Sequence, residues 1–146
     1  MLVTVPERAK EIREANIALT AACPMRCGYC FIDKDSPESI SLDDALRAAA
    51  FILSSPGRRK AIHLYGGEPL LRFDLVKAVI AFSKAEAARL GKDFFSGICS
   101  NGTLIEKKHL DYLSRERVHL SLSLNGSRQT HDRFRRLKNG RGSFEL

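Results

Sequence analysis

The stretch Cys23-Pro-Met-Arg-Cys27-Gly-Tyr-Cys30-Phe31 decides how the rest of this sequence is interpreted. It places three thiols on one short loop with the spacing C-x-x-x-C-x-x-C. Thiolate is the ligand that iron favours in iron–sulfur clusters. Three cysteines on one loop can hold three irons of a four-iron cube and leave the fourth iron open to an exogenous ligand. An open position of this kind is typical of a reactive metal centre rather than a structural one.

Clustered cysteines also occur in disulfide scaffolds, structural zinc sites and redox pairs. A disulfide scaffold is disfavoured because the 146 residues contain four cysteines and no secretory signal precedes them. A zinc site usually combines two C-x-x-C pairs, so its fourth ligand here would have to come from Cys99 or from a distant histidine. The spacing therefore favours the cluster and leaves a non-enzymatic zinc-binding module as an alternative.

The composition favours one modest domain, since 44% of the residues are hydrophobic and suffice for a core. No apolar run reaches membrane-spanning length, and residues 1–16 lack an apolar signal segment, so we expect a cytoplasmic protein without a membrane partner.

The formal net charge is +7. Basic residues gather near the end of the chain: Arg128, Arg133, Arg135, Arg136, Lys138 and Arg141. Phe134 is the one aromatic residue interleaved with them, so a solvated surface with a few anion contacts is favoured over a nucleic-acid patch.

The sequence around the cysteine loop has the periodicity of a strand followed by a helix. Residues 15–20 alternate and predict a first strand, which the cysteine loop follows directly. A helix is expected after Ser41, a good N-cap, with Asp44 at the capping-box position and Pro56-Gly57 as the stop. Its predicted buried face consists of Leu42, Ala45, Leu46, Ala49, Ala50 and Leu53.

A second strand is predicted at residues 61–65, and Gly66-Gly67-Glu68-Pro69 follows it at once. Two glycines at a strand end let the backbone approach a ligand closely, because they carry no Cβ. Glu68 offers an acceptor suited to an ammonium group. On its own, the run is also compatible with a plain turn. A second helix is expected over residues 73–90, with Gly91 as its stop.

A third strand, residues 94–99, leads into Ser100-Asn101-Gly102-Thr103. Cys99 lies inside this strand and is expected to be a buried, inert thiol rather than a fourth ligand. A third helix over residues 106–115 should bury Leu110 and Leu113.

Residues 118–124 alternate and predict a fourth strand. Its apolar side is Val118, Leu120, Leu122 and Leu124, and its polar side is His119, Ser121 and Ser123. The alternating order of strands and helices favours parallel pairing. The polar side should then line a lumen.

Taken together, these motifs resemble the radical S-adenosylmethionine (SAM) superfamily. The cysteine loop is similar to its cluster signature, and Gly66–Pro69 is similar to the motif that holds the methionine end of SAM. The last motifs are Ser123-Leu-Asn125-Gly126, Thr130-His131-Asp132-Arg133-Phe134-Arg135 and Gly140-Arg-Gly142-Ser143-Phe144. They resemble the group that includes anaerobic sulfatase maturases and ribosomal-peptide maturases. Asn125 stands where that group usually has aspartate, so its hydrogen bonds to ribose would carry no charge.

The resemblance implies an α/β fold, namely a partial (βα) barrel truncated after about four βα units. Residues 1–14 would be an N-terminal extension and residues 15–146 the N-terminal portion of the core domain, without its last strands or any auxiliary-cluster domain. The implied cluster ligands are Cys23, Cys27 and Cys30. The implied SAM-binding residues are Tyr29, Gly66, Gly67, Glu68, Pro69, Ser100, Asn101, Ser123 and Asn125.

The resemblance also implies a reaction. In that superfamily an electron from a 4Fe–4S cluster splits SAM and gives a 5′-deoxyadenosyl radical, which abstracts a hydrogen atom. We therefore expect an enzyme that matures a peptide or protein substrate and receives electrons from a donor such as flavodoxin or ferredoxin. A radical SAM enzyme acting on RNA or a small metabolite is the alternative. No catalytic residue is assigned. By residue type His131, Asp132 and Arg135 could form a catalytic set, but a structural role is favoured, in which they orient the loop after the fourth strand.

Overall fold

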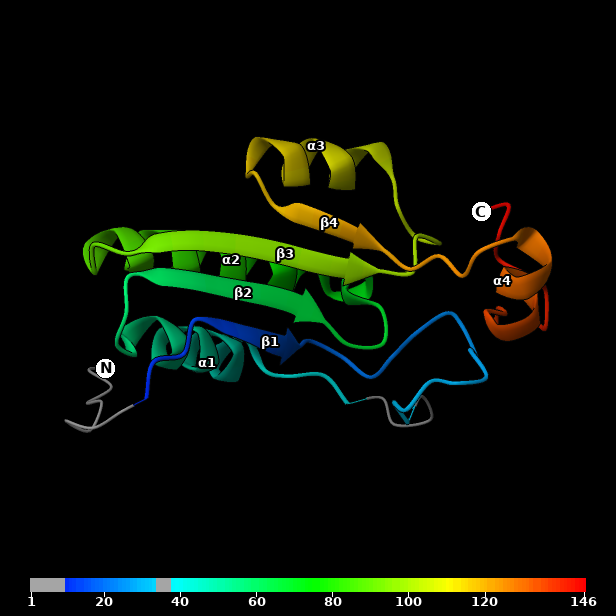
Figure 1. The fold of residues 1–146 in the computed structure, drawn as a ribbon, viewed down its shortest axis with the longest axis horizontal. Coiled ribbons are helices and arrows are strands. Elements are labelled where there is room, and N and C mark those ends of the chain that lie inside the picture. Colours follow the sequence, from blue (N-terminus) through cyan, green and yellow to red (C-terminus); the bar gives the residue numbers. More distant parts are fainter. Residues whose placement is uncertain (1–9, 34–37) are drawn as a thin grey trace.

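Four parallel strands in the order β1-β2-β3-β4 form the centre of the fold (Figure 1). The computed structural model describes residues 10–33 and 38–146. The strands are β1 (Glu14–Ala18), β2 (Arg59–Tyr65), β3 (Asp93–Ser100) and β4 (His119–Leu122). The helices are α1 (Leu42–Ser54), the 3-10 turn η1 (Pro69–Arg72), α2 (Phe73–Arg89), α3 (Lys107–Arg115) and α4 (Arg128–Phe134). The predicted parallel βα order is confirmed, and each strand overlaps its predicted range.

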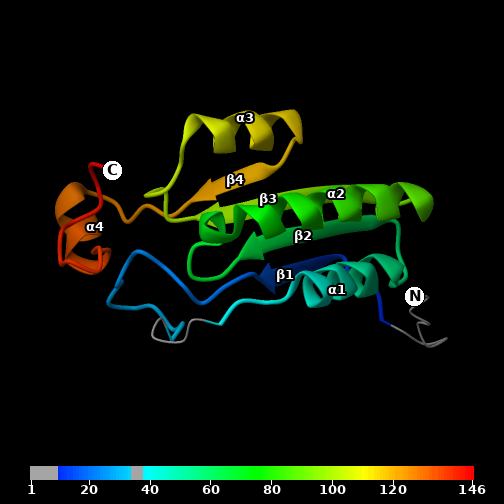
Figure 2. The same ribbon diagram turned by 180° about the vertical axis from the view of Figure 1, so that it is seen from behind.

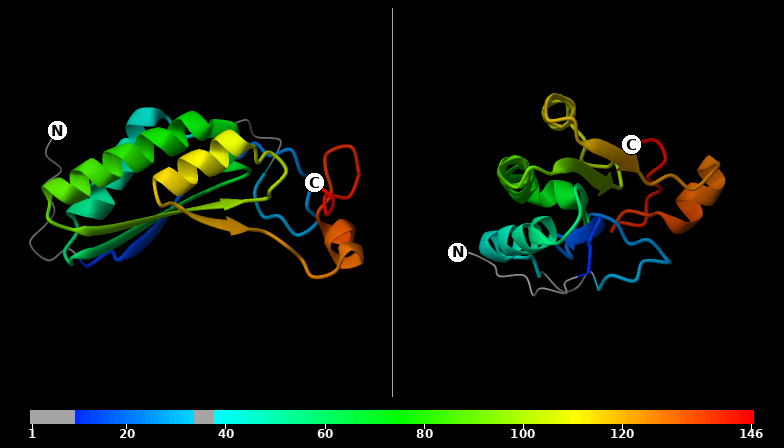
Figure 3. Two further views of the ribbon diagram at one scale, coloured as in Figure 1. Left: turned by 90° about the horizontal axis from the view of Figure 1, so that it is seen from above. Right: turned by 60° about the vertical axis from the view of Figure 1, so that its left-hand side comes forward.

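Helices α1, α2 and α3 cover one face of the sheet, and within the described residues the other face is bare (Figures 2 and 3). The core lies between the sheet and these helices. It includes Ile17, Leu19, Ala45, Ala49, Ile52, Leu53, Ile62, Leu64, Val76, Val79, Ile80 and Ile98. On the bare face, Asn16, His63, Gly97 and His119 stand in register across the four strands. This two-faced sheet is the open, partial (βα) barrel that the sequence predicts.

Helix α1 begins as expected, because the Ser41 hydroxyl accepts a hydrogen bond from Asp44 N at 3.0 Å. Its buried face differs from the prediction at Leu42, which is exposed, and at Leu46 and Ala50, which are half-buried. Ile52 is buried in addition. Leu42 is the first residue of the helix, and the first helical residue packed in the core is Ala45, three residues later. Helix α2 ends at Arg89 with Leu90 as its C-cap, and Gly91 follows with a φ of 65°, which fits the predicted stop.

Helix α3 and strand β4 are less well buried than predicted. Helix α3 turns His109 and Leu113 to the interior, one helical turn apart, so Leu110 is exposed and its predicted burial is wrong. Strand β4 ends at Leu122, and both Leu122 and Leu124 are exposed. Among the described residues β4 is an edge strand, which leaves the end of its apolar side without cover.

Residues 1–9 of the expected N-terminal extension lie outside the described part of the chain. Glu14, the last residue of that expected extension, opens β1 instead. No helix within the described ranges has the length and hydropathy of a membrane span.

Candidate functional site

The carboxyl ends of the four strands point to the same end of the sheet (Figure 1). The loops that follow the strands surround a cavity of about 190 Å³. Nine of the twelve predicted site residues line it: Cys23, Cys27, Tyr29, Cys30, Gly66, Gly67, Ser100, Asn101 and Ser123. They come from loops up to 100 residues apart in the chain. The structure therefore brings together most of what the motifs predict as one site.

The cysteine loop after β1 brings its three thiols to the cavity at different depths. Cys23 and Met25 are buried, while Cys27 and Cys30 are half-buried at the cavity wall. The Asn101 side-chain amide donates to Cys23 Sγ at 3.5 Å. A hydrogen bond to a ligating sulfur is one of the means by which proteins adjust the potential of an iron–sulfur cluster. Asn101 thus contacts the candidate metal-ligand set in addition to lining the cavity.

The turn after β2 packs directly on the cysteine loop. Gly67 N donates to Thr20 O at 2.6 Å, and Glu68 N donates to Ala22 O at 2.9 Å. A Cβ built on Gly66 would overlap Thr20 O, and one built on Gly67 would overlap Ala22 O. The absence of side chains at these two glycines therefore lets two backbone segments of this chain pack closely together. Both glycines also line the cavity, and their role in the approach of a ligand stays a prediction.

Glu68 is fully buried and lies beneath the cavity rather than in its wall. Its Oε1 accepts from Leu70 N at 3.1 Å and from the Ser100 hydroxyl at 2.9 Å, and its Oε2 accepts from Asn101 N at 2.8 Å. Burial raises the pKa of this carboxyl, and the three hydrogen bonds oppose that change. Donors of the chain thus contact both oxygens, and the role of Glu68 as an acceptor for an ammonium group stays a prediction. Pro69 likewise is buried and opens η1.

Arg135 is predicted to orient the loop after the fourth strand, but its guanidinium contacts Tyr29 of the cysteine loop. It is 6% exposed and lines the cavity, and its Nη1 donates to the Tyr29 hydroxyl at 2.8 Å. That hydroxyl donates in turn to Asn125 Oδ1 at 3.2 Å. Within the described residues Arg135 Nε is buried without a hydrogen-bond partner. A buried guanidinium with an unused donor at a cavity wall suits an anionic ligand. The signal was present as the arginine of His131-Asp-x-x-Arg135.

The neighbouring motif residues do support the loop after β4, as predicted. His131 Nδ1 accepts from Asn125 N at 3.3 Å, and His131 Nε2 lies 3.0 Å from the Ser143 hydroxyl. Asp132 Oδ1 accepts from Phe144 N at 3.0 Å. Asn125 lies outside the cavity lining and reaches it through Tyr29.

Cys99 lies in the cavity wall and is exposed, so the prediction of a buried thiol is wrong. It occupies a position of β3 that points to the bare face, whereas Ile98 and Ser100 on either side are buried. Its Sγ lies 3.9 Å from the Ser123 hydroxyl. Among residues 10–33 and 38–146, no three His, Cys, Asp or Glu side chains gather as the ligands of a single metal ion.

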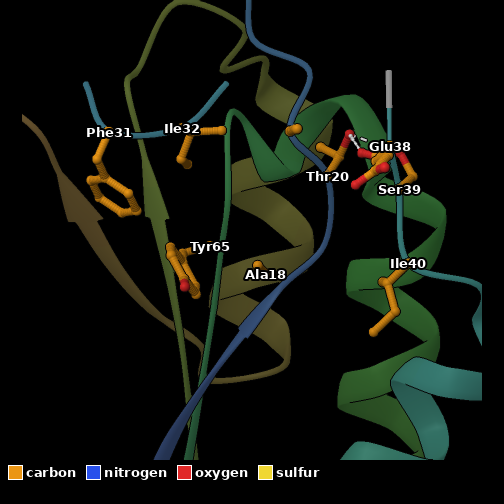
Figure 4. Close-up of a pocket in the computed structure, with 9 residues that line it drawn as sticks. Ala18, Thr20, Phe31, Ile32, Glu38, Ser39, Ile40 and Tyr65 are labelled. Atoms are coloured by element: carbon orange, nitrogen blue, oxygen red, sulfur yellow. Dashed lines mark hydrogen bonds between the residues drawn. The ribbon is translucent and has the colours of Figure 1, made fainter. Parts of the chain in front are cut away.

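A second cavity of about 510 Å³ adjoins the first along β1 (Figure 4). Phe31, Ile32 and Tyr65 line both cavities. At its far side, the Thr20 hydroxyl donates to Glu38 O at 3.3 Å and accepts from the Ser39 hydroxyl at 2.8 Å. The space beside the cysteine loop therefore continues past Phe31, a side chain that is 86% exposed.

Three comparisons place this arrangement among known proteins. The family model described as the radical SAM superfamily matches residues 17–146. A probable GTP 3′,8-cyclase of Methanococcus maripaludis is 34% identical over 117 residues, which are 77% of this chain and 37% of that protein. A serine-type anaerobic sulfatase-maturating enzyme of Bacteroides thetaiotaomicron is 26% identical over 133 residues, which are 85% of this chain and 32% of the relative.

Among solved structures, native anSMEcpe with bound AdoMet and the Cp18Cys peptide superposes with a TM-score of 0.78. The sequence identity is 21%, and the match covers 90% of this chain and 36% of that one. This likeness shows the fold. The chain thus spans about a third of the length of these three proteins.

Proposed function

The chain belongs to the radical SAM superfamily, and from this premise we propose that it holds a 4Fe–4S cluster on Cys23, Cys27 and Cys30 and binds SAM in the adjoining cavity. The main support for this proposal is that one cavity is lined by three thiols of one loop and by motif residues of three further loops. When bound, the cluster supplies the electron that splits the sulfonium of SAM and starts hydrogen-atom abstraction.

The donor set fits both groups. Three separate thiolates can each bind one iron of a cube and leave one iron for a chelating ligand. Arg135 supplies a fixed positive charge at the cavity wall and an unused Nε–H, which suit the carboxylate of SAM. Tyr29 is held by Arg135 and Asn125, so its ring has one orientation at the mouth of the cavity. Ser123 and Asn125 are proposed to lie near the ribose.

We propose a peptide or protein substrate for the whole protein. The sulfatase-maturating relative and the peptide-bound structural neighbour support this proposal. A small metabolite is the second candidate, because the GTP 3′,8-cyclase relatives are the more similar in sequence. A reducing compartment such as the cytoplasm suits an exposed cluster, and an external one-electron carrier must supply the electron.

Anaerobic reconstitution with iron and sulfide tests the cluster. We expect about four irons per chain, with loss of the cluster in Cys27→Ala and its retention in Cys99→Ala. The second variant is the matched control, because Cys99 lines the same cavity but lies on β3. Retention of iron by Cys27→Ala together with its loss from Cys99→Ala would contradict the ligand assignment.

The substrate class is tested separately with the full-length protein. Reductive SAM cleavage is followed with serine- or cysteine-containing peptides and, in parallel, with nucleoside triphosphates. Stimulation by peptides supports the maturase proposal, and stimulation by GTP alone favours the metabolite alternative.

A further inference from the structure

The basic segment near the end of the chain lies directly against the cysteine loop. Arg26 N donates to Arg136 O at 2.7 Å, Gly28 N donates to Phe134 O at 2.9 Å, and Lys138 N donates to Pro24 O at 3.1 Å. Met25 and Leu137 form an antiparallel bridge between the same two segments. More than a hundred residues of sequence separate them. Residues 134–138 therefore act as an added strand along the outer side of the cysteine loop.

The side chains of this segment give the outer side a positive charge. We define the basic surface as the exposed residues Arg133, Arg136, Lys138 and Arg141. Among residues 10–33 and 38–146, the ion pairs of this part of the chain both involve Arg128, which lies 3.7 Å from Asp132 and 3.0 Å from Glu145. The cysteine loop from residue 23 to residue 31 contains no acidic residue. The positive charge of the basic surface is thus largely uncompensated.

The basic surface is also close to the thiols. Hydrogen-bonded neighbouring strands lie about 4.8 Å apart, so residues 134–138 are one strand spacing from the backbone of the cysteine loop. Cys27 and Cys30 are half-buried. A protein that docks on the basic surface would therefore stand one layer of backbone away from the cluster ligands, where an electron has a short distance to travel.

We propose that the basic surface docks the acidic one-electron carrier protein that reduces the cluster. The inference rests on the proposed function, because it presupposes a cluster on the three cysteines. In the step itself the carrier loses one electron and the cluster gains one, and no covalent bond forms or breaks. Opposite charges on two proteins steer their encounter and raise the association rate by about 10- to 1000-fold. Such encounters need only a small interface.

A nucleic acid is the less suitable occupant. Single-stranded nucleic acids are bound by aromatic side chains that stack on bases, in addition to positive charge. Phe134 is the aromatic residue within this segment, and its ring already lies 5.3 Å from the Arg133 guanidinium and 6.3 Å from the Tyr29 ring. The basic surface therefore offers four positive charges beside one ring of the segment, Phe134, which is 39% exposed, rather than a row of stacking rings.

The test compares two charge-reversed proteins that carry the reconstituted cluster. Lys138→Glu with Arg141→Glu reverses two exposed charges of the basic surface. Lys10→Glu with Lys77→Glu is the matched control, because it reverses two exposed charges elsewhere: before β1 and on α2. Stopped-flow absorbance measures reduction of the cluster by reduced flavodoxin, at low and high salt, and by dithionite.

We expect the basic-surface variant to react with flavodoxin at least about tenfold more slowly at low salt, with a weakened salt dependence. The control should stay near the unchanged protein, and dithionite should reduce all three alike. Equal flavodoxin rates and salt dependence in both variants would overturn the docking proposal while the cluster assignment stands. A loss of RNA binding with unchanged flavodoxin rates would overturn it in favour of a nucleic-acid surface. Failure of dithionite to reduce the unchanged protein would instead refute the proposed function.

Discussion

The turns after β1 and β2 meet at one cavity, yet they are held in place from different sides. The turn after β2 is anchored from within by Glu68, whose carboxylate joins it to the end of β3. The cysteine loop after β1 is anchored from outside by residues 134–138. A Cβ on Gly67 would overlap Ala22 O, whereas a Cβ on Gly28 meets nothing within 4 Å. The turn after β2 is a rigid template, and the cysteine loop retains room to adjust when its cysteines take up iron.

Removing the anchor of the rigid turn should have the largest effect. Glu68→Ala leaves Leu70 N, Asn101 N and the Ser100 hydroxyl without their acceptor in a buried place. Hydrogen bonds to charged groups contribute about 1.5–3 kcal/mol each, so we expect a loss of at least about 3 kcal/mol in the free energy of unfolding. Urea denaturation of the cluster-free protein measures it.

The control for this prediction is Glu86→Ala, which removes the same side chain from a partly exposed position on α2. Glu86 pairs with Arg89 at the surface of the helix, and such pairs contribute little to stability. An equal, small loss in both variants would show that the Glu68 carboxylate is not an anchor.

A smaller effect is expected when a methyl group is added to a glycine, and it should differ between the two turns. Gly67→Ala forces a Cβ against the Ala22 backbone, and overpacking of this kind costs about 1–3 kcal/mol. It should also shift the cysteine loop and lower the yield of reconstituted cluster. Gly28→Ala adds the same atom to the cysteine loop in open space and should leave stability and iron content nearly unchanged. Equal iron contents and equal stabilities in the two variants would contradict the contrast between a rigid and an adjustable turn.

The same contrast explains which features the sequence could predict. Apolar periodicity and turn residues are local signals, so the strands, α1 and α2 are predicted closely, and strand ends locate the site. The burial of Glu68 depends on donors at residues 100 and 101, and the pairing of residues 134–138 with the cysteine loop has no local signal. The prediction for Cys99 is wrong because its strand has one bare face, which a short run of apolar residues does not indicate.

One of the groups that support residues 134–138 is titratable, namely His131. Its Nδ1 accepts from Asn125 N, so the ring proton is on Nε2 and donates to the Ser143 hydroxyl. That hydroxyl donates to Arg135 O at 2.8 Å, which ties the motif to the segment beside the cysteine loop. Burial lowers the pKa of His131, the charge of Arg135 lowers it further, and Asp132 opposes both. Protonation would place a second donor against Asn125 N and break this contact.

The smallest expected effect is therefore a dependence of stability on pH. Because the pKa of His131 is lower in the folded state than in the unfolded chain, the unfolded chain binds more protons. This contribution to stability is complete above about pH 6.5 and declines as the pH falls. We expect a loss of about 1 kcal/mol, the size of one hydrogen bond, between about pH 7.5 and pH 5.5 in the cluster-free protein.

His131→Gln keeps a donor toward Ser143 but does not titrate, so the difference between it and the unchanged protein should shrink as the pH falls. His119→Gln, on the exposed start of β4, should track the unchanged protein throughout. If the difference in the free energy of unfolding between His131→Gln and the unchanged protein is constant across this pH range, the neutral ring of His131 does not support residues 134–138. The cysteine loop is then supported by its backbone hydrogen bonds to residues 134–138 alone.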